Sequence, residues 1–377
     1  MPLNNFKFFL KKKLDVQEKK LLAEKLPFLD QKITKVTFGA NYLSLNFLKN
    51  FKIDEIKKKK IENFIQKFLY HSNPVEGKVI YESDHITKKK NNNYFKELLN
   101  KKYIRKIDNG IYSKESDFLK FKNNIDTFLK KRLTDNRYIE TAYSGMLPVK
   151  SLVKNSYISS FPHQCVFVSF TKRELKSLKN LTNLKNDNSK DIKKNIQNPD
   201  YMMSPTICYN CFETLKKQKM KKSQYYTSIG NCYRYEGLNY KNFERLKIYE
   251  MREWIIFGKP KIVELEIKRI LDKLKKILNN WKIQFRIVSA SDPFFLNEKI
   301  KKKIFQLSFK LKYELEFFLP YEKKWIAVAS FNNHLDSIVK NYDIKSTNNL
   351  KINSGCIGIG YERFLYALYS QKGIFKV

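Results

Sequence analysis

The stretch SGCIGIGYERFLYALYS, residues 354–370, gives the strongest indication of the fold. Isoleucine and glycine alternate from Ile357 to Gly360, which predicts a strand, and the apolar spacing after Tyr361 predicts a helix. Gly358-x-Gly360-x-x-Arg363 matches half of the dinucleotide-binding fingerprint, but its last glycine is replaced by Arg and no βαβ unit follows. The sequence therefore argues against a dinucleotide-binding fold. Arg363, in the first helical turn, either points its planar guanidinium at phosphate oxygens or lies on the surface.

The segments before this stretch predict antiparallel strands with helices set apart from them, so we expect the α+β class. The strands are expected at residues 226–237 (YTSIGNCYRYEG), 245–258 (RLKIYEMREWIIFG), 307–318 (LSFKLKYELEFF) and 324–332 (KWIAVASFN). Residues 263–278 have the apolar spacing of a long amphipathic helix. Residues 95–133 are expected to form two helices with a turn at Asn109–Gly110.

The period of two along these strands places polar side chains together. Arg234 and Glu236 share one face of their strand, where they suit a phosphate and an adenine amine or simply form a cross-strand ion pair. Glu314 and Glu316 share a face with Lys312, as a Mg²⁺-binding pair or as the solvated side of an amphipathic strand. Ser330 and Asn332 are likewise neighbours on one face.

Residues 1–95 are expected to form an N-terminal extension, as a small accessory domain, and residues 96–377 the main domain. Residues 172–200 are rich in Lys, Asn and Leu, which predicts a surface insertion. The five cysteines are too few and too scattered for a disulfide framework, which favours a reducing cytoplasmic location. No apolar run reaches the length of about 20 residues that crosses a bilayer, so we expect no membrane association.

The formal net charge of +38 has two interpretations. It would suit an anionic partner such as a nucleic acid. Alternatively it reflects compositional drift, because Lys far outnumbers Arg and Asn, Ile, Phe and Tyr are abundant throughout the chain. The charge alone identifies no partner.

The order of these segments resembles the catalytic core of the class II aminoacyl-tRNA synthetases. Residues 143–162 (YSGMLPVKSLVKNSYISSFP) stand at the place of motif 1, the dimer-forming element, residues 232–258 at motif 2 and residues 356–364 at motif 3. The segments KYELEFFLP (312–320) and SFNNH (330–334) resemble the atypical, zinc-dependent seryl-tRNA synthetases. The resemblance implies an antiparallel sheet flanked by helices and a homodimer formed through motif 1.

The likeness narrows further to truncated homologues of those enzymes, the amino acid:[carrier protein] ligases. It rests on YMMSPTICYNC (201–211), SDPFF (291–295), VASFNNHLD (328–336) and the glycine-rich stretch above, and it covers about residues 96–377. The sequence departs from the family at Asp336-Ser-Ile-Val, which lacks a glycine expected there.

The resemblance implies a zinc site at Cys208, Glu253 and Cys356, which are separated by 45 and 103 residues. Three protein ligands leave the fourth tetrahedral position open, as in catalytic zinc sites. Cys208-x-x-Cys211 alone would also suit a redox pair or half of a Cys₄ site, but the chain has no second CxxC.

The resemblance further implies ATP as a cofactor, with Arg234 and Arg363 as catalytic residues at the α- and γ-phosphates and Glu236 at the adenine. Glu314 and Glu316 would hold Mg²⁺, because the strand IAVA (326–329) lacks the glutamate that seryl enzymes use. Ser330 and Asn332 are expected to contact the amino acid.

The expected function is therefore ATP-dependent activation of glycine or alanine and its transfer to the phosphopantetheine thiol of a holo carrier protein. Carrier proteins are acidic, so the basic charge would speed their encounter with the chain. Two alternatives stay open: a seryl-type synthetase that charges tRNA, and a non-catalytic, synthetase-like RNA-binding protein.

Overall fold

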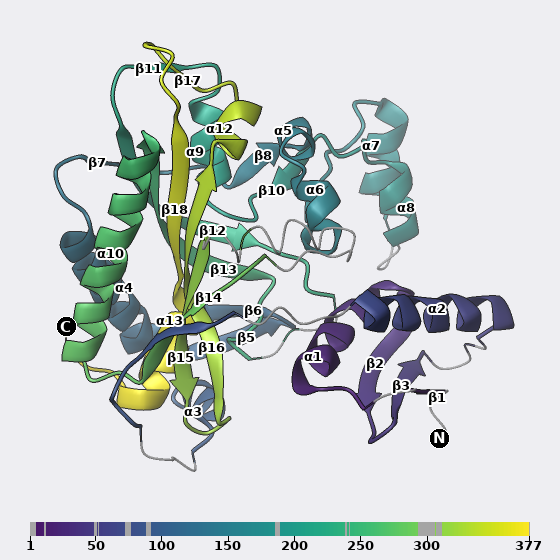
Figure 1. Cartoon of the computed structure of the whole chain (residues 1–377). Coiled ribbons are helices and arrows are strands. Elements are labelled where there is room, and N and C mark those ends of the chain that lie inside the picture. Colours follow the sequence, from purple (N-terminus) through teal and green to yellow (C-terminus); the bar gives the residue numbers. More distant parts are fainter. Residues whose placement is uncertain are drawn as a thin grey trace.

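A single large sheet forms the centre of the molecule in a computed structural model (Figure 1). The structure describes residues 5–376 except 11–12, 49–50, 52, 72–76, 88–91, 185–188, 238–239, 241, 293–305 and 307–310. The first residues of the strand expected at 307–318, and most of SDPFF, thus lie outside the described residues. Across the sheet the strands are β4 (Val79–Glu82), β14 (Phe285–Ser289), β15 (Lys312–Leu319), β16 (Lys324–Leu335), β18 (Asn353–Gly360), β13 (Ile248–Gly258), β12 (Gln224–Tyr233) and β7 (Tyr138–Glu140).

Neighbouring strands of this sheet are antiparallel, apart from β7, which runs parallel to β12. The helices are grouped on the faces of the sheet and do not alternate with its strands along the chain. This arrangement confirms the expected α+β class.

Three helices cover one face of the sheet and form the main core. They are α4 (Ser116–Leu133), α10 (Pro260–Asn280) and α13 (Tyr361–Lys372). Their apolar sides pack against every second residue of the strands, including Trp254, Ile357 and Phe331, which are fully buried. Helix α10 thereby confirms the periodicity seen at 263–278.

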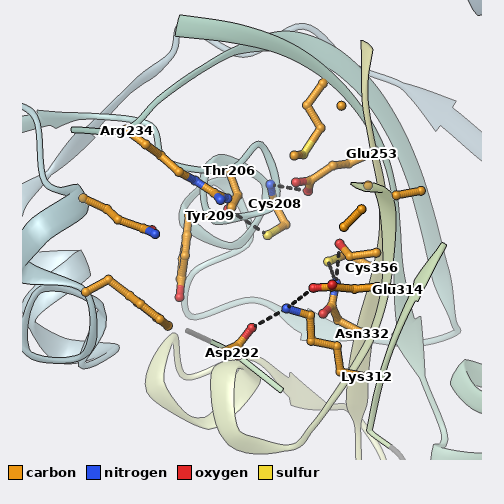
Figure 2. Close-up of a pocket in the computed structure, with 18 of the residues that line it drawn as sticks. Thr206, Cys208, Tyr209, Arg234, Glu253, Asp292, Lys312, Glu314, Asn332 and Cys356 are labelled. Carbon is orange, nitrogen blue, oxygen red and sulfur yellow. Dashed lines mark hydrogen bonds and ion pairs between the residues drawn. The ribbon is translucent and has the colours of Figure 1, made fainter. Parts of the chain in front are cut away.

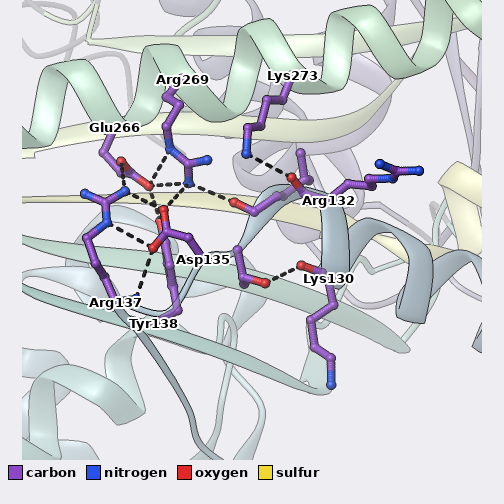
Figure 3. Close-up of polar contacts among 10 residues, drawn as sticks. Lys130, Arg132, Asp135, Arg137, Tyr138, Glu266, Arg269 and Lys273 are labelled. Atoms are coloured by element: carbon purple, nitrogen blue, oxygen red, sulfur yellow. Dashed lines mark hydrogen bonds and ion pairs between the residues drawn. The ribbon is translucent and has the colours of Figure 1, made fainter.

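A buried carboxylate ties the edge of the sheet to this helical layer (Figure 3). Glu266 of α10 accepts hydrogen bonds from the Tyr138 hydroxyl at 2.8 Å, from Arg137 at 2.9 Å and from Arg269. Burial alone would raise the pKa of Glu266, but these three donors lower it below its usual value. The short strand β7, which begins at Tyr138, is therefore held by polar contacts as well as by its three-residue pairing with β12.

The opposite face of the sheet carries smaller elements. Helix α9 (Cys208–Thr214) and helix α12 (Ser337–Asn341) pack on it in a second apolar cluster with Ile255, Phe257 and Cys356. The remaining elements on this side are short: β8 (Met146–Pro148), α5 (Val149–Lys154), α6 (Tyr157–Ser160), η2 (Pro162–Gln164), β9 (Phe167–Val168), β10 (Tyr201–Met203), β11 (Lys219–Met220) and β17 (Lys345–Ser346).

The N-terminal residues form a module with its own core, called the N-terminal module below. It comprises β1 (Asn5–Phe9), α1 (Val16–Lys25), η1 (Leu26–Phe28), β2 (Ile33–Phe38), β3 (Tyr42–Phe47) and α2 (Glu55–His71). Figure 1 shows it beside the large sheet, at the lower right. Strand β4 lies before the boundary expected at residue 95, yet it pairs with β14 of the large sheet. The module therefore ends before residue 79.

Two segments differ from, or add to, the sequence expectations. Helix α3 (Tyr94–Asn100) is followed by a hairpin of β5 (Ile104–Asp108) and β6 (Ile111–Lys114) before α4 begins. The turn at Asn109–Gly110 thus joins two strands and not two helices, because Asn-Gly favours a tight hairpin. The insertion at 172–200 carries α7 (Leu175–Thr182) and α8 (Ser189–Lys194), which lie at the periphery in Figure 1. No helix among the described residues combines the length and apolar character needed to cross a membrane.

Candidate active site

The fold gathers the three expected zinc ligands at one point. Cys208 begins α9, Glu253 lies in β13 and Cys356 in β18, and each is at most 5% exposed. One ligand atom from each of the three lies within 4.8 Å of the others. Two thiolates and a carboxylate suit Zn²⁺, with metal–ligand distances of about 2.0–2.3 Å, so small side-chain rotations would let one ion contact all three.

Strand pairing explains why residues so distant in sequence meet here. A row of paired residues crosses four strands, from Glu314 to Ser330, then Gly358 and then Glu253. The next row places Asn332 opposite Cys356. Because paired residues point to the same side of a sheet, these side chains all face the cavity side.

The pKa values of Glu253, Cys208 and Cys356 indicate that negative charge on this cluster is costly without a cation. Burial raises the pKa of Glu253 to about 8, and the negative charge of Cys356 adds to the effect. The hydrogen bond to Cys356 and burial likewise raise the pKa of Cys208, while that same bond and nearby His334 lower the pKa of Cys356. The Glu253 carboxylate also accepts backbone hydrogen bonds, from Cys208 at 2.7 Å and from Ile207 at 3.3 Å. Three buried acidic groups with few positive neighbours are costly unless a cation compensates them.

Further polar groups support the cysteine ligands. Asn332 lies 3.6 Å from the Cys356 sulfur and donates to Ser330 at 3.2 Å. His334 Nε2 lies 3.5 Å from the Cys356 sulfur, and its Nδ1 contacts Ser354 at 3.2 Å. Such partners orient metal ligands and set their basicity. Sequence reasoning placed Ser330 and Asn332 here, and for His334 it favoured a hydrogen-bonded structural role over that of a metal ligand.

A cavity of about 830 Å³ extends from this cluster, and both expected catalytic arginines line it. Figure 2 shows Arg234 across the cavity from Cys356 and Glu314. Arg234 donates to the Pro205 carbonyl at 3.1 Å and stacks over Tyr249, with 5.4 Å between the guanidinium and the ring centre. Arg363 donates to the carbonyls of Glu244 at 2.5 Å and Ala327 at 3.4 Å. Among the described residues, no carboxylate oxygen lies within ion-pair distance of either guanidinium.

Glu236 lines the same cavity but already has a partner. Its carboxylate accepts a hydrogen bond from Arg245 at 2.7 Å, and its side chain is only 10% exposed.

Burial lowers the pKa of Arg363, and the positive charges of Arg245 and Arg234 lower it further. The guanidinium groups of Arg234, Arg245 and Arg363 are thus close enough to repel one another, and a polyanion between them would relieve this repulsion.

Only one of the two expected magnesium carboxylates lies in the cavity. Glu314 lines it, 3.2 Å from Lys312. Glu316 is not among the lining residues and pairs with Arg286 of β14 at 2.6 Å. The expectation that Glu314 and Glu316 together line a Mg²⁺ site is therefore corrected. The neighbouring strand β14 supplies Glu316 with a cation, Arg286, outside the cavity.

The buried Lys312 and the half-buried Met251, for which the sequence predicted no ligand contact, complete the wall. Lys312 lies between Glu314 and Asp292, 2.8 Å from the Asp292 carboxylate (Figure 2). Met251 precedes Glu253 by two positions on the same face of β13 and lines the cavity. The period of two along β15 placed Lys312 on the face of Glu314, and the same period along β13 was the signal that could have identified Met251.

The chain is similar in sequence to known proteins. Residues 191–372 match the model of the tRNA synthetase class II core domain (G, H, P, S and T). The chain is 23% identical over 265 residues to the type-2 serine–tRNA ligase of Methanopyrus kandleri, a match that covers 65% of this chain and 50% of that protein. It is 28% identical over 249 residues to amino acid–[acyl-carrier-protein] ligase 1 of Bradyrhizobium diazoefficiens, covering 64% of this chain and 74% of that protein.

Solved structures show the same fold. M. kandleri SerRS, in a complex with A. aeolicus tRNASec, superposes with a TM-score of 0.71 at 17% identity, over 98% of this chain and 75% of that chain. The seryl-tRNA synthetase from Pyrococcus horikoshii complexed with ATP gives a TM-score of 0.57 at 12% identity, over 84% of this chain and 74% of that chain. The chain spans about half the length of the curated serine–tRNA ligases that it matches. Its fold is that of the class II aminoacyl-tRNA synthetases, and residues 191–372 match the model of their core domain.

Proposed function

We propose that this chain activates a small amino acid, glycine or alanine, with ATP and transfers it to the phosphopantetheine thiol of a carrier protein. One observation carries the proposal. A single cavity joins a buried set of zinc donors to two arginines that have no carboxylate partner among the described residues. An amino acid at one end and a nucleotide triphosphate at the other would together fill it, since ligand cavities typically measure about 300–1,000 Å³.

The two ends of the cavity have complementary roles in this proposal. Zinc held by Cys208, Glu253 and Cys356 would supply an open coordination position for the neutral α-amino group. Along β13, Glu253 marks the amino end, and Tyr249, under Arg234, marks the phosphate end. Met251 lies between them, below the position where the α-carbon would sit. This spacing holds the two reactants next to each other, which lowers the entropic barrier to their reaction.

In the first step an oxygen of the amino acid carboxylate attacks the α-phosphorus, and pyrophosphate leaves with the electron pair of the broken P–O bond. Arg234 would stabilise the charge that develops on the α-phosphate, and Arg363 the γ-phosphate. Glu236 would accept a hydrogen bond from the adenine amine, and Glu314 would hold Mg²⁺ beside the triphosphate. In the second step the carrier thiol attacks the activated carbonyl and AMP leaves.

The choice of acceptor rests on the relatives. The carrier-protein ligase of B. diazoefficiens is matched over 74% of its length at 28% identity, whereas the serine–tRNA ligase of M. kandleri is matched over 50%. A basic chain also suits an acidic carrier. We further propose a homodimer through residues 143–162, where Met146 and Val153 are 38% and 58% exposed apolar residues.

A second candidate is the charging of tRNA. The superposition on M. kandleri SerRS covers 98% of this chain, so it extends through most of the N-terminal module. This likeness concerns the fold alone, but it is the reason for naming tRNA as the second candidate acceptor. A non-catalytic role is the third candidate, and the two cavity arginines, which have no carboxylate partner in the part of the chain that the structure describes, argue against it.

Two experiments test the proposal. Labelled amino acid and ATP are offered with either holo carrier protein or total tRNA. Label on the carrier alone supports the proposal, label on tRNA supports the second candidate, and failure to form an adenylate supports the third. In parallel, Cys356→Ser should lose bound zinc and amino-acid-dependent ATP–pyrophosphate exchange. Full exchange by a zinc-free variant would refute the role of the metal.

A further inference from the structure

The N-terminal module contacts the catalytic half beside the nucleotide end of the cavity. Arg245, in the loop between β12 and β13, bonds two carboxylates at once: Glu236 of the cavity at 2.7 Å and Glu24 of α1. The side chains of Arg245 and Glu24 are 27% and 22% exposed. A chain of charge-assisted hydrogen bonds thus runs from the module to a residue that lines the cavity.

An aromatic contact lies beside this ion-pair chain. Phe28 of η1 packs edge-on against Tyr235 at 5.8 Å and against His163 at 5.6 Å between ring centres. Its ring also fills the space next to Gly237, where an added Cβ would lie 2.8 Å from the ring. Gly237 has a φ of +62°, so the turn that follows Glu236 depends on glycine and sits directly against Phe28.

The packing of the N-terminal module fixes the positions of the Glu24 and Phe28 side chains. Helix α1 begins with a reciprocal capping box between Asp15 and Glu18. Leu22 and Leu26, on either side of Glu24, are fully buried in the core of the module. Glu24 and Phe28 therefore project from a packed surface and not from a free tail.

We propose that Glu24 and Phe28 are positioning residues for nucleotide binding, acting through Arg245 and through the turn at Gly237. The inference rests on the proposed function, since it assigns ATP to this end of the cavity. Glu24 neutralises part of the charge of Arg245, which otherwise repels Arg363, and it fixes the guanidinium that orients Glu236. The N-terminal module thereby contributes to the ATP site without touching the nucleotide.

The test compares Glu24→Gln and Phe28→Ala with the wild-type full-length chain. Each variant should raise the KM for ATP about tenfold in ATP–pyrophosphate exchange, as expected when a hydrogen-bonded charge partner is lost. The KM for the amino acid and the zinc content should stay unchanged, because the contacts of Glu24 and Phe28 described above involve none of the three zinc donors. Glu24→Asp, which keeps the charge, should recover part of the ATP affinity.

Glu55→Gln is the matched control, because it makes the same substitution in the same module at a side chain that is 89% exposed. Direct titration with a non-hydrolysable ATP analogue, with thermal unfolding of each variant, separates binding from turnover and from folding. An ATP affinity unchanged in both Glu24→Gln and Phe28→Ala overturns the inference alone. Wild-type protein that binds no ATP overturns the proposed function, and the inference with it.

Discussion

The glycine at 358 should set how large an amino acid the site accepts. It pairs with Glu253 on one side and Ser330 on the other, in the middle of the row that forms the floor of the cavity. A Cβ added to it would lie 3.0 Å from Met251 Sδ, 3.5 Å from Glu253 Cγ and 3.7 Å from Glu253 Oε1. Gly358→Ala therefore pushes the Met251 thioether toward the space between the zinc donors and Arg234.

The magnitude follows from these contacts. The contact with Met251 is too tight by a few tenths of an ångström, and the contacts with Glu253 are ordinary. Displacing a flexible side chain from its preferred rotamer costs about 0.5–1.5 kcal/mol, and overpacking costs about 1–3 kcal/mol. A loss of about 1–2 kcal/mol of amino acid binding corresponds to a rise in KM of roughly 5- to 30-fold.

The assay is ATP–pyrophosphate exchange measured against glycine and alanine, with zinc content and the KM for ATP determined alongside. The KM for alanine should rise more than the KM for glycine, because the methyl group of alanine competes for space with the displaced Met251 thioether. Gly360→Ala is the matched control on the same face of β18, since its Cβ would meet only Tyr249, at 4.0 Å. Its amino acid KM should change by no more than about twofold. A folded, zinc-loaded Gly358→Ala protein with wild-type KM values for both amino acids would refute the reasoning.

Three other substitutions test the electrostatics. Glu314→Gln should raise the Mg²⁺ concentration needed for half-maximal exchange, whereas Glu316→Gln should not, because only Glu314 lines the cavity; equal effects would contradict this assignment. Asp126→Asn should lower the free energy of unfolding at pH 7 by about 3–5 kcal/mol, since it removes the carboxylate that bonds the buried Arg252 at 2.8 Å and leaves this charge with Glu140, which is 3.4 Å away and 52% exposed. Burial alone would raise the pKa of Asp126, but its hydrogen bonds from Arg252 and Tyr361 lower it below 3.8. The stability that this carboxylate contributes is thus present above that pH and lost as the pH falls further, so wild type and variant should converge in acid denaturation. A difference in unfolding free energy between wild type and Asp126→Asn that stayed constant down to pH 2 would argue against this role of the Asp126 carboxylate.

The spacing of apolar residues along the sequence predicted those strands and helices that bury one face at regular intervals. The alternation in residues 312–318 appears as β15, and the apolar spacing at 263–278 appears as α10. The hairpin at 104–114 was missed, since its short strands have no clear alternation and α4 follows directly. An Asn-Gly turn between two apolar segments was the available signal.

The sequence by itself determined the class of the fold, the order of its strands and helices, and the residue types available for the chemistry. The tertiary structure alone decided which of those residues meet. Cys208, Glu253 and Cys356 converge because β13 pairs with β18 and α9 packs against β13. Glu316 is drawn away from Glu314 by Arg286, and Glu24 reaches Arg245 from a separate module. Periodicity is a property of neighbours along the chain, whereas strand pairing and ion pairing join residues more than a hundred positions apart.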